Sequence, residues 1–514
     1  MIPAVLCGAA VLLPLGYLAR RALEVDMALV AERILPWSTL RELLGNTLLL
    51  TAGVLVITCL LALPAAWLTT HTDLPGRRML TWAAVLPLAI PAYLMAYTLL
   101  SLSGDYGVAN RALGVRVPPL RGLSGSLIAL SLYNYPYMFL NLRVALRELD
   151  PALIETARSL GHRPGRILFS VYLPHLKPAL LAGALLIALH VIADFGVVSL
   201  LRYRTFSYEI YSRYTSAYSP TEAAWPALVL VVLAGALLLV EAGMLRGLRL
   251  DPTARGVVRR RRPVTLGLWA LPAYVYIVLL MLASVVIPVA TILFWALRSE
   301  FGRLAGDLGS ALSASVRASL PAAVLATLLA APIAYMALRY RSKLSFVLER
   351  LAFVGYATPA LAFGLGIAFF TLRFEVGGEA ILYQSLTVMI LAYSLHFLAE
   401  AVGPIRSSLY QATPRLEEAA RSLGAGPFET FRRVTFPLLR NGLAVSTALV
   451  FLSCMKELPL TFMLRPTGFD TLAFNVWDKT NDAAYADAAP YAFSILLISA
   501  SFVGILLLQG RARS

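Results

Sequence analysis

Long apolar segments recur along the whole 514-residue chain, and they constrain its fold more than any other feature. The hydrocarbon core of a bilayer, about 30 Å thick, is crossed by roughly 20 helical residues. The sequence predicts twelve such spans, at residues 2–19, 46–69, 80–102, 124–142, 179–200, 225–245, 267–297, 315–338, 351–372, 382–403, 442–463 and 489–509. Strands of a transmembrane barrel would alternate in polarity over about ten residues, which these segments do not. We therefore expect an all-α integral membrane protein.

The charged residues support this class and indicate an orientation. Only 14% of the residues are charged, whereas soluble domains carry about 25%. The net charge of +16 would suit nucleic-acid binding, but the basic residues occupy short loops and form no basic domain. Lys and Arg are more frequent in the even-numbered connections, so the positive-inside rule predicts a cytoplasmic amino terminus. The expected contact is the lipid bilayer and not nucleic acid.

The cysteines and histidines do not predict a metal site. Cys7, Cys59 and Cys454 lie in predicted spans, where we expect them to act as small buried apolar residues. His190 lies one turn before Asp194, but a lone histidine on an apolar helix is more often a packing residue, and the other histidines lack metal-ligand spacing. The first span has no basic leader, so we expect it to be retained in the mature protein. We expect no metal or cofactor bound by this chain.

The sequence repeats itself, which implies two structurally equivalent halves. Residues 1–245 align with residues 267–514, at an offset of 268 that becomes 263 after the third span of each half; Pro91 matches Pro359, for example. Each half contains six predicted spans, so the repeat is parallel and not inverted. The halves are joined by a basic linker at 246–266, which we expect on the cytoplasmic side, near anionic lipid headgroups.

The strongest part of the repeat is a pair of loops between the fourth and fifth spans of each half, at residues 150–175 and 413–438. Within these paired loops, Pro151–Gly161 and Pro414–Gly424 share eight of eleven residues. Each copy predicts a helix with a capping residue and proline at its start, a glycine suited to its end, and a second helix. Small residues on one face of a helix allow it to lie close to a partner. An ordinary amphipathic helix is the alternative for one copy, but two matched copies argue against it.

The pattern Glu-Ala-Ala, three residues, Gly resembles the EAA signature in permease subunits of binding-protein-dependent ABC importers of the type I class. The resemblance implies a fold of two parallel six-helix repeats, with each loop forming a coupling helix that docks on a separate, ATP-using ATPase subunit. Thr156 departs from the pattern in replacing the first alanine by another small residue. The residues that the resemblance assigns to ATPase coupling are Glu155, Thr156, Ala157, Gly161, Glu418, Ala419, Ala420 and Gly424.

Further segments resemble the fused permeases of ferric-iron importers: Ile192–Gly196, Met455–Pro459, Leu464–Pro466 and Phe469–Ala473. Thiamine and aminoethylphosphonate permeases share much of this pattern. The resemblance thus implies ferric iron as the cargo, with those two solutes as alternatives. It also implies a bacterial cytoplasmic (inner) membrane and a periplasmic or lipid-anchored binding protein that delivers the solute.

Two rival functions explain the sequence less well. A secondary transporter with twelve spans could contain repeats and pathway charges, but it needs no matched pair of docking helices. A membrane enzyme or scaffold would require clustered catalytic side chains, which the sequence lacks. The chain also has no Gly-x-x-x-x-Gly-Lys-Ser/Thr phosphate loop, so we do not expect it to be an enzyme that hydrolyses ATP.

Several charged residues lie within predicted spans, among them Asp194, Lys456 and Glu457. Asp194 and Glu457 occupy the same position of the repeat, and Lys456 precedes Glu457. A charge at the bilayer centre costs about 2.5–3.5 kcal/mol on insertion scales and normally faces the interior of the bundle. One hypothesis is that Asp194, Lys456 and Glu457 line or gate the transport pathway. The other is that they pair and hold the two halves together.

Overall fold

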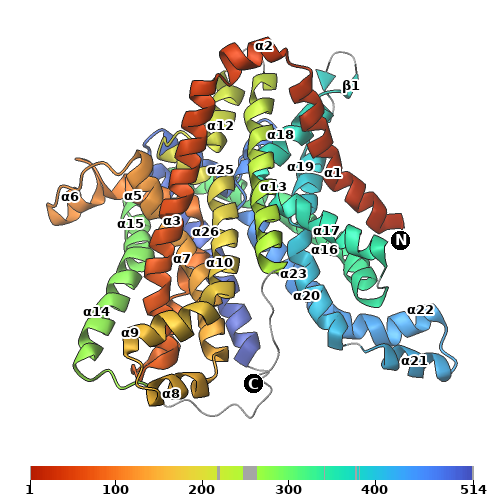
Figure 1. Cartoon of the computed structure of the whole chain (residues 1–514). Coiled ribbons are helices and arrows are strands. Elements are labelled where there is room, and N and C mark those ends of the chain that lie inside the picture. The colour runs from red at the N-terminus through yellow and green to blue at the C-terminus, as the bar shows by residue number, and fades with distance from the viewer. Residues whose placement is uncertain are drawn as a thin grey trace. The chain divides into compact units, whose positions relative to one another are not determined.

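The computed structural model describes residues 2–216, 220–246, 263–340, 342–376, 379–380, 382–411 and 413–511. These residues are predominantly helical (Figure 1), as the apolar segments predict. The strands found in them are β1 (Glu375–Val376) and β2 (Glu379–Ala380), which pair antiparallel. The chain divides into two compact units. The first-repeat unit consists of Arg41–Thr205 and Val232–Leu297, and the second-repeat unit consists of Met1–Leu40, Phe206–Val231 and Arg298–Ser514.

Most elements of the first-repeat unit come from the first half of the sequence. They are α3 (Trp37–His71), α4 (Arg77–Ala83), η2 (Leu86–Ala89), α5 (Ala92–Leu102), α6 (Val108–Leu113), α7 (Gly122–Glu148), α8 (Pro151–Ser159), α9 (Pro164–Ile167), η3 (Leu168–Tyr172), α10 (Leu173–Ala193), α11 (Gly196–Leu200), η5 (Gly267–Trp269), α14 (Ala270–Met281), η6 (Leu282–Val286) and α15 (Ile287–Ala296). Helix α3 begins four residues before this unit does, at Trp37, and α13 (Ala224–Arg246) is divided between the two units.

Most elements of the second-repeat unit come from the second half. They are α1 (Ile2–Leu23), α2 (Met27–Leu29), η1 (Val30–Ile34), α12 (Phe206–Ser216), η4 (Pro220–Ala223), α16 (Phe301–Arg339), α17 (Lys343–Ala357), α18 (Ala360–Thr371), β1, β2, α19 (Leu386–His396), α20 (Leu398–Gln411), α21 (Pro414–Ser422), α22 (Pro427–Thr430), η7 (Phe431–Thr435), α23 (Phe436–Met455), α24 (Pro459–Leu464), α25 (Leu472–Asn481) and α26 (Tyr485–Arg511).

Each predicted span coincides with helical structure, but several are not single straight helices. In the described residues, seven helices are long and apolar enough to cross a membrane, or up to ten if each of three bent pairs is one span. The two other predicted spans, 124–142 and 489–509, lie in α7 and α26, each 27 residues long, which are not among those ten. By length and composition alone, the structure therefore supports seven to ten of the twelve spans.

Two of the bent spans turn at the matched prolines. The chain bends by 87° before α5 and by 100° between α17 and α18. Pro91 and Pro359 lie at these bends, and the residue before each is extended. Proline lacks an N–H and disfavours a helical conformation in the residue before it. The predicted spans 80–102 and 351–372 are therefore each bent at a proline, which the apolar pattern did not indicate.

The compact units exchange their opening spans relative to the sequence halves. Helix α1 packs against α17 and α18 in the second-repeat unit, whereas α15 packs against α5 in the first-repeat unit. The hydroxyl of Tyr276 on α14 donates to the Leu61 carbonyl of α3 at 2.5 Å. The repeat in the sequence runs over residues 1–245 and 267–514. The compact units differ from these halves because the opening span of the first half belongs to the second-repeat unit, and the opening span of the second half belongs to the first-repeat unit. Most of the predicted linker, residues 247–262, lies outside the described residues.

The packing of α1 on α18 depends on a glycine. A Cβ added at Gly366 would lie 2.3 Å from the carbonyl oxygen of Pro14, which is too close for two such atoms. We expect Gly366→Ala to destabilise the protein by about 1–3 kcal/mol through overpacking, and to lower the Tm of the purified protein. Gly403→Ala on α20 is the control, since a Cβ there meets nothing within 4 Å. Equal Tm values for the two variants would contradict this role of Gly366.

Candidate functional site

The paired loops have the predicted helix-turn-helix structure, element for element. Helix α8 corresponds to α21 and α9 to α22, each at the offset of 263 residues. Each loop continues through a five-residue π-helical segment, η3 or η7, into the next long helix. In Figure 1, α21 and α22 extend from the end of α20. The two halves therefore also match in the position of a π-helical segment, which the sequence pattern does not reveal.

Local interactions set the ends of α8 and α21. The Asp150 carboxylate accepts a hydrogen bond from the Ala152 N–H at 2.9 Å, which satisfies a free donor at the start of α8. Thr413 takes the same position before α21 without a side-chain bond. Gly161 and Gly424 follow the helices with φ of +74° and +87°, a left-handed conformation that suits glycine. A Cβ at either glycine would meet nothing within 4 Å, so the surface around both is open.

Most of the residues assigned to coupling lie on exposed surface, and the alanines at the third position of the motif are the exception. Ala157 is buried in an apolar cluster with Ile154, and Ala420 is half-buried. The two alanines therefore face their own loops, at least in part. The exposed members of the set are Glu155, Thr156, Gly161, Glu418, Ala419 and Gly424.

Two leucines that the motif does not include extend the exposed surface. Leu160 is 69% exposed and Leu423 is 89% exposed, and each directly precedes the terminating glycine of its loop. Leu153 and Leu416, about two helical turns earlier, are also exposed. Exposed apolar side chains beside charged ones are typical of protein interaction sites. The signal in the sequence was that these leucines repeat at matched positions in a polar segment.

Asp194 and Glu457 lie where two predicted spans break. After α10 and α23 the chain leaves the helix and starts a short one, α11 or α24. The Asp194 carboxylate accepts a hydrogen bond from the Val197 N–H at 2.9 Å, and the Glu457 carboxylate accepts one from the Leu460 N–H at 3.0 Å. Each carboxylate therefore caps the short helix that follows it. The predicted spans 179–200 and 442–463 are thus interrupted at these residues, and the role of the charges in transport stays a prediction.

A further acidic residue, Glu400 on α20, was missed by sequence reasoning, although an ionisable residue inside an apolar span is itself a signal. Its carboxylate accepts a hydrogen bond from the Ser453 hydroxyl at 2.9 Å and interacts electrostatically with Lys456. The first half has Tyr137 and His190 at the positions of Glu400 and Ser453, and their rings pack 4.9 Å apart. His190 thus packs against a ring, and these two positions of the first half hold no counterpart of the Glu400–Ser453 hydrogen bond.

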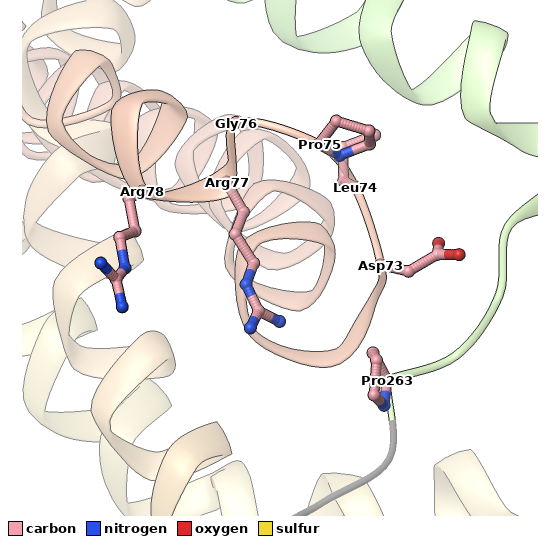
Figure 2. Close-up of a pocket in the computed structure, with 7 residues that line it drawn as sticks. All are labelled: Asp73, Leu74, Pro75, Gly76, Arg77, Arg78 and Pro263. Carbon is pink, nitrogen blue, oxygen red and sulfur yellow. The ribbon is translucent and has the colours of Figure 1, made fainter.

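A pocket of about 470 Å³ lies beyond the end of α3 (Figure 2). Its lining residues are Asp73, Leu74, Pro75, Gly76, Arg77, Arg78 and Pro263. The Asp73 carboxylate accepts a hydrogen bond from the Leu266 N–H at 3.1 Å, so the chain leading into α14 is attached beside α3. Figure 2 shows the guanidinium groups of Arg77 and Arg78 pointing the same way. In the part of the chain that is described, no cluster of three or more His, Cys, Asp or Glu could hold a metal ion.

Comparison with known proteins adds independent information. Residues 56–249 and 323–512 match the family described as "Binding-protein-dependent transport system inner membrane component". The Fe(3+)-transport system permease protein FbpB 2 of Haemophilus influenzae is 32% identical over 500 residues, which cover 96% of this chain and 95% of that protein. The probable ABC transporter permease protein y4fN of Sinorhizobium fredii is 26% identical, with coverage of 92% and 87%.

A shorter match involves a putative 2-aminoethylphosphonate transport system permease protein, PhnV of Salmonella typhimurium. It is 29% identical over 183 residues, covering 35% of this chain and 66% of that protein. The two segments that match the family begin inside α3 and α16, the second predicted span of each half. The opening spans, which the compact units exchange, therefore lie outside the two segments that match the family description.

Proposed function

Because this chain belongs to the family of binding-protein-dependent transport system inner membrane components, we propose that it forms the membrane pathway for ferric iron in an ATP-driven importer. It is a multi-pass membrane protein and the permease of an ABC importer. Its relatives are transport permease subunits, so it is not itself an enzyme. Membership of this family argues against the two rival functions, a secondary transporter and a membrane enzyme.

The paired loops are the observation that supports ATPase docking. Both present a helix with an exposed glutamate, an exposed leucine and a left-handed glycine in the same order. Two separate ATPase subunits would dock there, one on each loop, and use the ATP. This chain would bind no cofactor. The contacts would be made by the exposed residues of the motif, which are Glu155, Thr156, Gly161, Glu418, Ala419 and Gly424. Ala157 and Ala420 would instead pack, at least in part, against their own loops.

Alternating access follows from how each loop continues into the membrane. Helix α10 has 21 residues, so it spans about 30 Å from the first loop to the break at Asp194. The equivalent path in the second half runs along α23 to Glu457. Movement of a docked loop would therefore displace the short helix beyond each break. ATP-driven closure of the ATPases would draw the loops together and open the pathway outward, and ADP release would reverse this.

The location and orientation are also proposals. The membrane would be the bacterial cytoplasmic (inner) membrane, with the amino terminus and both paired loops in the cytoplasm. The excess of Lys and Arg in the even-numbered connections supports this orientation. A periplasmic or lipid-anchored binding protein would deliver the solute on the opposite side. Asp194, Lys456 and Glu457 are candidates for lining or gating the pathway.

Uptake of radiolabelled ferric iron in cells with and without this chain tests the cargo. We expect deletion to reduce iron uptake to background and to leave thiamine uptake unchanged. The relative that supports iron is named as an Fe(3+)-transport permease and is 32% identical to this chain over almost its whole length. Aminoethylphosphonate is the second candidate, favoured by the shorter match to PhnV. Loss of thiamine or aminoethylphosphonate uptake with iron uptake intact would overturn the assignment to iron.

A further inference from the structure

The paired loops have the same backbone structure, but different kinds of side-chain contact hold each loop to its own unit. In α8 the buried residues are Ile154 and Ala157. Glu417 occupies the position of Ile154 in α21, and it is buried, with 7% exposure. Among the residues of α21 whose burial is described, Glu417 is the buried one. The inward side chain of the second loop helix is therefore a carboxylate instead of a hydrocarbon.

The Glu417 carboxylate is bound by two other elements of the second-repeat unit. Nη2 of Arg339, at the end of α16, lies 3.2 Å from Glu417 Oε1, and the two side chains are only 12% and 10% exposed. The Thr435 hydroxyl, at the end of η7, donates to the same oxygen at 3.1 Å. A charge with so little access to water requires a partner, and this carboxylate has both an opposite charge and a hydroxyl. The ion pair thus joins α21 to the end of α16.

The same three positions of the first half are aromatic or apolar. His71 corresponds to Arg339, Ile154 to Glu417 and Tyr172 to Thr435, by the offsets of the repeat. The rings of His71 and Tyr172 lie 5.6 Å apart. Ile154 packs in a buried cluster with Leu149, Ala157 and Ile167, against which Tyr172 also packs. Ile154 carries no charge, so the buried side chain of the first loop helix packs by apolar contact at the position where Glu417 forms an ion pair.

These two attachments have different mechanical properties. Apolar contact is non-directional and tolerates small sliding movements. A hydrogen-bonded ion pair between a guanidinium and a carboxylate has a preferred geometry, and separating it leaves two charges poorly solvated. A loop held by an ion pair is therefore fixed in one position more strictly than a loop held by apolar side chains.

We propose that Arg339 and Glu417 are positioning residues that lock the second loop helix, α21, to the end of α16, so that the two loops transmit ATPase movement unequally. The proposal rests on the proposed function, because it assumes that the loops dock ATPase subunits. Neither residue contacts the ATPase in this scheme, and both act by holding the exposed Glu418 and Leu423 in place. The first loop would follow its ATPase more freely.

Spin-label mobility on the chain alone tests the lock without any partner. A nitroxide is attached at Leu423→Cys or, as the matched position, Leu160→Cys, after replacement of the three native cysteines, Cys7, Cys59 and Cys454. We expect Glu417→Gln and Arg339→Gln each to mobilise the label at 423 and not the label at 160. The exchange Arg339→Glu with Glu417→Arg should restore the original mobility. Unchanged mobility at 423 in both single variants would overturn the proposal.

A second measurement follows coupling in the assembled importer. We expect Glu417→Gln to lower ferric-iron uptake per ATP hydrolysed roughly tenfold or more, since it removes the negative charge that pairs with the poorly exposed Arg339. Co-purification of the ATPase should persist. Glu349→Gln is the control, because it breaks an ion pair to Arg406 in the same unit whose arginine side chain is 45% exposed, and such pairs contribute little.

The outcomes separate the two proposals. If the parent chain fails to co-purify with an ATPase, the proposed function is wrong, while label mobility still decides whether the lock exists. If Glu417→Gln imports iron with parental coupling, or the charge exchange fails to restore mobility, the lock is wrong while the proposed function stands.

Discussion

The double variant Gly161→Val/Gly424→Val is expected to lose ATPase co-purification completely. Both glycines have positive φ, where an L-residue costs roughly 1–2 kcal/mol and a β-branched one more. Valine would move the backbone toward negative φ and turn Leu160 and Leu423 away from the docking surface. Each single variant should weaken the association about tenfold, the factor that corresponds to 1.4 kcal/mol. The measurement is the amount of ATPase recovered with the affinity-purified chain, normalised to membrane abundance.

Each loop contains its own control glycine. Gly165 and Gly426 also have open surroundings, with nothing within 4 Å of an added Cβ, but neither has positive φ. Valine at these positions adds the same volume to the same loops without the backbone strain. We expect Gly165→Val and Gly426→Val to retain the ATPase. Equal losses at control and test positions would show that added bulk, and not the left-handed turn, is what matters.

The double variant Asp194→Asn/Glu457→Gln is expected to import at least about tenfold less iron at normal membrane abundance, the factor that corresponds to 1.4 kcal/mol. Asparagine and glutamine keep an oxygen that can accept the hydrogen bonds from Val197 and Leu460, so the short helices stay capped. The negative charges are removed. Uptake of radiolabelled iron and immunoblotting of membranes measure the two quantities separately.

Alanine variants distinguish charge from capping. Asp194→Ala and Glu457→Ala remove both the charge and the cap, and loss of a cap costs about 1 kcal/mol of stability. We expect lower abundance with alanine than with the amide variants. If the amide variants import iron normally and only the alanine variants lose protein, the two carboxylates are helix caps, and the hypothesis of pathway charges is wrong.

Local signals predicted the helical class, the repeat and the paired loops. The length of an apolar segment is enough to predict a membrane span. The prolines and glycines of the loops could be interpreted because each affects mainly the backbone next to it. The bends were harder to predict, because proline alone does not decide them. Pro64 lies inside α3 and Pro136 inside α7 without ending either helix, whereas Pro91 and Pro359 lie at sharp turns. A proline in an apolar segment therefore does not by itself show whether the helix continues or bends.

Features that depend on distant residues were not predictable. Arg339 and Glu417 are 78 residues apart, and each resembles an ordinary loop charge until the fold brings them together. The exchange of opening spans requires Gly366 to meet Pro14, and no periodicity links these two positions. The buried face of Ala157 follows from the packing of its loop, whereas the motif alone suggested contact with a partner.

The exchange of opening spans has a consequence for biosynthesis. Helix α1 leaves the ribosome first, but α18 begins at Ala360, 337 residues after α1 ends at Leu23. At about 5–20 residues per second, translation separates the two helices by tens of seconds. Throughout that interval the face of α1 that packs on α18 in the finished protein must face lipid or a temporary neighbour. The first-repeat unit likewise waits for α14 and α15, so it cannot complete its packing before the opening span of the second half has been inserted.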